Sequence, residues 1–127
     1  MSFVPRLSLL PGRFAVARLD AAAPLPPAPA DAALWSVTRT RDELSLVCEE
    51  SLVPAGAWAD RAWRAFGLAG PIPFEQTGVI AGITTPLADA GIPVFVLSTF
   101  YTDYLLVREA HVDRVREVLT SAGCEVR

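Results

Sequence analysis

The chain has 127 residues, 52% of them hydrophobic, and its eleven basic and fourteen acidic side chains give a net charge of -3. This length can bury a substantial core, as one domain or as two half-size repeats that share a sheet. No apolar run approaches the roughly 20 residues of a membrane-spanning helix, and no secretory signal is recognisable. We therefore expect a cytoplasmic protein without a membrane as a partner. Because no basic cluster forms a track for phosphates, we do not expect nucleic acid as a partner either.

The amino-terminal half contains a proline-rich segment followed by a predicted hairpin. Residues 24–29 read PLPPAP, which is too rich in proline for a helix. Residues 35–49 alternate as two strands would, and Leu44, Leu46 and Cys48 fall on one predicted buried face.

The carboxyl-terminal half begins with a strand-like run over residues 62–68, and we expect Trp58 and Trp63 to serve core or interface packing. A helix is predicted over residues 77–90, with Gly91 as its stop and Pro86 as an interruption or kink.

Two further elements follow, and a short strand ends the chain. Residues 92–107 read IPVFVLSTFYTDYLLV, which predicts two strands joined by a polar turn. Residues 110–122 have the apolar stripe of a half-buried helix, and residues 124–127 supply the last strand. The order strand, helix, strand, strand, helix, strand predicts an α+β fold with the ferredoxin-like βαββαβ motif.

The hairpin pattern occurs twice in the sequence. A shift of sixty positions places Trp35 under Phe95 and Glu43 under Asp103. We therefore interpret residues 1–60 as a degenerate copy, in which the proline-rich segment replaces the first helix, and residues 61–127 as the intact domain.

No pattern in the sequence indicates catalysis. Cys48 and Cys124 are too few and too far apart for a metal framework, so we expect free thiols, no metal and no cofactor. His111 lies near the start of the second helix and is interpreted as solvated. Because the usual catalytic and phosphate-binding motifs are missing, we predict that the protein is not an enzyme.

The carboxyl-terminal half resembles the ACT domain family. The resemblance is closest in TGVIA, PLADAGIPVFVLST and TDYLLVRE, and it is of the type found in CASTOR arginine sensors and in the regulatory regions of aspartate kinases. It implies a regulatory module that binds an amino acid where two ACT units pair. The amino end of a helix suits the α-carboxylate of such a ligand, and a protein carboxylate suits its ammonium group.

The resemblance places one side of the ligand site in the loop 73–78, at Glu75, Gln76, Thr77 and Gly78. Gly78 either lets the ligand approach the backbone or lets the helix pack tightly on the sheet. Gln76 stands where the arginine sensors have a glutamate, so arginine specificity does not carry over. Glu75 compensates only if its side chain points into the pocket.

The other side of the site lies in the turn of the second hairpin. The resemblance assigns ligand contacts to Thr99, Phe100 and Asp103, with Asp103 at the position of an acidic ligand contact. The alternative is that Asp103 is only a turn residue that bonds nearby backbone N–H groups, and that its two neighbours pack the turn.

The favoured function is therefore a non-catalytic module that binds an amino acid and regulates a separate protein. We expect a homodimer, because a second chain would cover exposed edge strands. The alternatives are an interaction module without a ligand site and, more remotely, an enzyme that uses Asp103 or Glu75 with His111.

Overall fold

A computed structural model describes residues 4–127, which form two compact units. We call residues 12–63 the β unit, and residues 4–11 with 64–127 the α+β unit. The long strand β5 (Trp58–Leu68) contributes its first half to one unit and its second half to the other. None of the helices in the described residues is long and apolar enough to cross a membrane.

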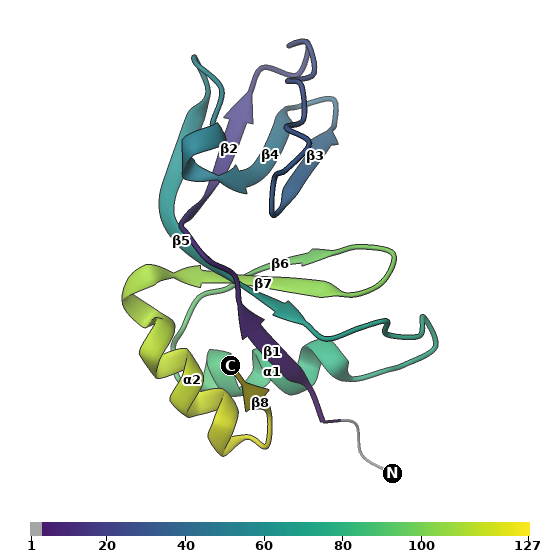
Figure 1. The fold of residues 1–127 in the computed structure, drawn as a ribbon, viewed down its shortest axis with the longest axis vertical. Helices are drawn as coiled ribbons and strands as arrows, with labels where there is room; N and C mark the ends of the chain where they lie inside the picture. Colours follow the sequence, from purple (N-terminus) through teal and green to yellow (C-terminus); the bar gives the residue numbers. More distant parts are fainter. Residues whose placement is uncertain (1–3) are drawn as a thin grey trace. The chain divides into compact units, whose positions relative to one another are not determined.

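The α+β unit confirms the predicted ferredoxin-like fold (Figure 1). Its strands have the order β6-β7-β5-β1-β8. Besides β5, its elements are β1 (Arg6–Leu9), α1 (Val79–Asp89), β6 (Phe95–Ser98), β7 (Asp103–Arg108), the short 3-10 helix η2 (Glu109–His111), α2 (Val112–Ser121) and β8 (Glu125–Val126).

The first strand of the chain belongs to the α+β unit, whereas the sequence analysis groups residues 1–60 together. Leu7 of β1 pairs antiparallel with Leu68 of β5 and parallel with Val126 of β8. Strand β1 therefore lies between β5 and the final strand. Burial explains why β1 takes this place in the sheet, because it puts the Leu7 side chain fully inside the core. Strand β8 has only two residues and is too short to cover β5 by itself.

Both helices cover the same face of this sheet, because one core cluster contains buried side chains from β1, β5, β7, α1 and α2. In α1 the buried positions are Val79, Ile83 and Leu87, at helical spacing. The helix runs through Pro86 without the predicted interruption.

The β unit contains the predicted first hairpin. Strands β2 (Phe14–Leu19), β3 (Trp35–Arg39) and β4 (Leu44–Glu49) pair in the order β3-β4-β2-β5, and the 3-10 helix η1 (Glu50–Leu52) follows β4.

The proline-rich segment between β2 and β3 is not helical and is held by hydrogen bonds from the strands. The Arg39 guanidinium donates to the carbonyl oxygens of Ala21 and Ala23. The Glu49 carboxylate accepts from the backbone N–H of Ala33 at 2.9 Å. These bonds fix a segment that has no regular structure of its own.

The two hairpins match with an offset of 59 positions, one fewer than the sequence comparison gives. Arg39 pairs with Leu44 across the first turn, and Ser98 pairs with Asp103 across the second. The turn geometry sets the register, so Leu44 corresponds to Asp103 and the predicted match of Glu43 with Asp103 is wrong.

Several predictions about single residues have clear outcomes. Leu44, Leu46 and Cys48 are buried as predicted, and both cysteines are free. Trp63 is buried, but Trp58 is 76% exposed with the Arg18 guanidinium 5.2 Å from its ring centroid, so core packing was wrong for Trp58.

His111 is half-buried rather than solvated. Its Nδ1 atom is buried and has no hydrogen-bond partner among the described residues. The residue ends the short helix η2, directly before Val112 of α2, which packs against the core, so the imidazole stands beside a core position.

Candidate functional site

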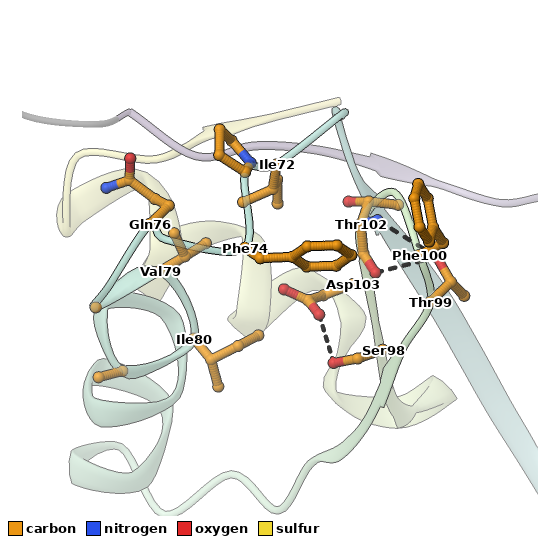
Figure 2. Close-up of a pocket in the computed structure, with 13 residues that line it drawn as sticks. Ile72, Phe74, Gln76, Val79, Ile80, Ser98, Thr99, Phe100, Thr102 and Asp103 are labelled. Atoms are coloured by element: carbon orange, nitrogen blue, oxygen red, sulfur yellow. Dashed lines mark hydrogen bonds between the residues drawn. The ribbon is translucent and has the colours of Figure 1, made fainter.

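A cavity of about 400 Å³ lies in the α+β unit between the β5–α1 loop, the first turn of α1 and the β6–β7 hairpin (Figure 2). Eight of the ten residues from Ile72 to Ala81 line it. The hairpin contributes the remaining lining residues: Ser98, Thr99, Phe100, Thr102 and Asp103.

The amino end of α1 opens onto this cavity. Gly78 is the N-cap residue, and among the described residues no side chain makes a capping hydrogen bond to the helix. Val79, Ile80 and Ala81 line the cavity, and backbone N–H groups in the first turn of a helix have no intrahelical acceptor. This wall therefore carries hydrogen-bond donors and the positive end of the helix dipole.

Gly78 is needed for its backbone conformation. Its φ of +78° is left-handed, which side chains disfavour. A Cβ atom at this position would meet no atom within 4 Å, so the tight-packing interpretation is wrong.

The opposite wall carries an acidic side chain, the only one that the described residues contribute to the lining. Asp103 is half-buried, and its Oδ1 accepts a hydrogen bond of 2.5 Å from Ser98 Oγ. In Figure 2 the carboxylate points toward α1. Among the described residues, the hydrogen-bond partner of Asp103 is thus a side chain and not the turn backbone, and the carboxylate has a second oxygen available to a ligand.

Thr99 supplies the turn chemistry that the alternative interpretation assigned to Asp103. Its N–H donates to the Thr102 carbonyl at 2.8 Å, and its Oγ1 accepts from the Thr102 N–H at 3.3 Å. Thr40 makes the equivalent backbone bond to the Glu43 carbonyl in the first hairpin, at 2.9 Å. A local turn motif therefore shapes both hairpins.

The loop and the turn are tied together. The Ile72 N–H donates to the Tyr101 carbonyl at 2.7 Å, and the Thr102 hydroxyl donates to the Leu68 carbonyl at 2.7 Å. A Cβ on Gly70 would lie 2.8 Å from the Tyr101 oxygen, so glycine is required there by the close approach of the two segments. These contacts hold the cavity walls in position.

An exposed aromatic cluster forms the rim of the cavity. Phe74 is 74% exposed and Phe100 is 71% exposed, and their ring centroids are 5.3 Å apart in an edge-to-face arrangement. Tyr101 contacts Phe100 from outside the cavity, with centroids 5.1 Å apart. Sequence reasoning missed Phe74, although a large apolar residue between proline and acidic neighbours in a loop was an available signal.

The structure brings five of the seven predicted site residues to one cavity: Gln76, Gly78, Thr99, Phe100 and Asp103. Thr77 instead lines a second hollow of about 260 Å³ on another side of the α1 amino end. Glu75 is exposed and lines neither of these two hollows.

The β unit lacks these features in its described residues. An irregular segment stands between β2 and β3, where α1 stands in the α+β unit, and Leu44 replaces Asp103. The helix end and the carboxylate are thus both confined to the α+β unit.

Family models match both parts of the chain. The ACT domain model matches residues 59–121, and a model that describes an N-terminal domain matches residues 12–56. The chain is an ACT-domain protein.

Relatives agree with this assignment. A human protein named cytosolic arginine sensor for mTORC1 subunit 1 is 41% identical over 58 residues, which are 45% of this chain but only 18% of that relative. The crystal structure of an Agobacterium tumefaciens protein is 35% identical with a TM-score of 0.90, covering 99% of this chain and 94% of the other.

A regulatory subunit of aspartate kinase from Thermus thermophilus shares the fold. Its TM-score is 0.59 at 11% identity, and the match covers 91% of this chain and 96% of that subunit. At this identity the likeness concerns the fold alone.

Proposed function

We propose that the protein is a non-catalytic regulatory module that binds a free amino acid in the cavity between α1 and the β6–β7 hairpin. The observation that carries this proposal is the pairing of opposite charge preferences across one cavity: the amino end of α1 on one wall and the Asp103 carboxylate on the other. A zwitterion is the ligand that such a pair of walls complements.

Each end of the ligand has a defined partner. The α-carboxylate accepts hydrogen bonds from first-turn N–H groups at Val79, Ile80 and Ala81. The α-ammonium group pairs with Asp103, whose position is fixed by Ser98. Gly78 leaves the backbone open to close approach.

A relative supports amino-acid regulation without fixing the ligand, since that relative is named an arginine sensor. Arginine itself is not proposed here, because Gln76 supplies an amide in this cavity and Glu75 lies outside it. Regulation would act on a separate protein.

We also propose that the two units derive from one repeated ACT-like domain, with the amino-terminal copy degenerate. The equal hairpin turns and the matching order of strands favour this origin. A cytosolic homodimer is part of the proposal, because the relative is named cytosolic and edge strands such as β6 favour pairing with a second chain.

The test is a thermal-shift screen of the protein against the twenty amino acids, in wild type and in Asp103→Asn. A ligand that favours the native state raises the melting temperature, and at a hundred times its Kd the gain is about 2.7 kcal/mol. We expect a hit whose shift is lost in Asp103→Asn and kept in Asp113→Asn, a matched change at an exposed position of α2. No response to any amino acid would instead favour an interaction module without a ligand.

A further inference from the structure

The side chains at the rim and in the lining of the cavity indicate which class of ligand side chain the site accepts. The inference drawn from them rests on the proposed function. Once the α-carboxylate faces α1 and the α-ammonium faces Asp103, no ionisable side chain of the lining remains for the ligand side chain, because Asp103 is the only one that lines the cavity among the described residues. The other lining side chains are uncharged, with hydroxyl groups at Ser98, Thr99 and Thr102, an amide at Gln76, and apolar groups that include Ile72, Pro73, Phe74 and Phe100.

The exposure of the two phenylalanine rings is the second observation. Phe74 and Phe100 come from different segments, contact one another edge to face, and are still more than 70% exposed. In Figure 2 the Phe74 ring extends from its loop toward the hairpin. Exposed apolar surface that borders a cavity is stabilised when an apolar group covers it.

We infer that Phe74 and Phe100 form the side-chain subsite and that the ligand is a neutral amino acid with a large aliphatic or aromatic side chain. A second cation, as in arginine, finds no second carboxylate in the lining. A second anion, as in glutamate, meets the Asp103 charge and finds no basic side chain. Charge balance and apolar surface therefore favour the same ligand class.

Isothermal titration calorimetry of the full chain with leucine, phenylalanine, alanine, arginine and glutamate tests this inference. We expect leucine or phenylalanine to bind at least about tenfold more tightly than alanine, because each added methylene in an apolar pocket contributes roughly tenfold or more. Arginine and glutamate should bind more weakly than the better of these two apolar ligands.

Two substitutions show whether Phe74 contacts the ligand side chain or whether any loss of an aromatic ring from the exposed cluster weakens binding. Phe74→Ala should weaken leucine binding by about tenfold and leave alanine binding within about twofold, because alanine has no side chain long enough to reach the ring. Tyr101→Ala is the matched control, since Tyr101 belongs to the same exposed cluster but does not line the cavity, and it should change neither affinity.

The outcomes also distinguish the two proposals. If arginine or glutamate binds more tightly than both leucine and phenylalanine, or if Phe74→Ala weakens alanine and leucine equally, the inference about the side chain is overturned while amino-acid binding stands. If none of these five amino acids binds while another of the twenty raises the melting temperature, the inference about the side chain is overturned. If none of the twenty does so either, both proposals are overturned.

Discussion

Two glycines at the start of α1 should respond in opposite directions to the same substitution. Gly78 has a left-handed φ of +78°, whereas Gly82 lies inside the helix, and a Cβ would meet no atom within 4 Å at either position. Gly78→Ala should therefore lower the free energy of unfolding by about 1–2 kcal/mol through backbone strain alone. Gly82→Ala should raise it by about 0.5–1 kcal/mol, because alanine is the better helix former.

Urea unfolding followed by circular dichroism measures both variants, since helix and sheet contribute to the signal. A change of 1 kcal/mol corresponds to a shift in melting temperature of about 3–5 °C for a chain of this size. A Gly78→Ala variant as stable as wild type would refute the left-handed conformation at the helix start. A destabilised Gly82→Ala would show that the space beside the helix is filled.

Three other predictions concern stability. Ala62 has a φ of 63° without being glycine, so Ala62→Gly should raise the free energy of unfolding by about 1 kcal/mol in the same urea assay, and a loss would contradict the strain. Thr40→Val and Thr99→Val each remove side-chain hydrogen bonds from a hairpin turn and should each cost about 1 kcal/mol by thermal unfolding; a neutral pair would mean that the turns hold without them. Burial raises the pKa of the Cys48 thiol to about 11 from its ordinary value of 9.0, with Glu49 adding to the rise. The folded state thus holds this proton longer than the unfolded state, and stability should be complete below pH 9.0 and fall as the pH rises toward about 11. Cys48→Ala should flatten this decline in urea titrations at each pH, and an unchanged slope would exclude the thiol as its source.

Most of the fold followed from the sequence because hydrophobic spacing and turn residues determine elements locally. The helix at residues 79–89 and both hairpins follow from apolar positions at helical or alternating spacing. The position of β1 did not follow, because this strand has only four residues, with Leu7 and Leu9 as its apolar positions, and the partners of Leu7, Leu68 and Val126, are far away in the chain. Long-range pairing leaves no local pattern.

The glycine and the carboxylate of the candidate site were predictable from the sequence. The exposed aromatic rim of the site was not. Gly78 and Asp103 were placed on one cavity by resemblance to the family, and the structure adds that Ser98 orients the carboxylate. The loop position of Phe74 between proline and glutamate was a signal in the sequence, but it did not decide between exposure and burial, because a phenylalanine in a loop is compatible with both. Its exposure beside Phe100 required the structure.

The central claim is that a free amino acid occupies the cavity between α1 and the β6–β7 hairpin. Nuclear magnetic resonance of the uniformly nitrogen-15-labelled protein, titrated with leucine, tests it most directly because each backbone amide reports its own surroundings. The account predicts that the largest shifts fall on residues 78–81 and 98–103, with little change in the β unit. Saturable shifts confined to other residues, or no saturable shift with leucine or with any other amino acid, would contradict it.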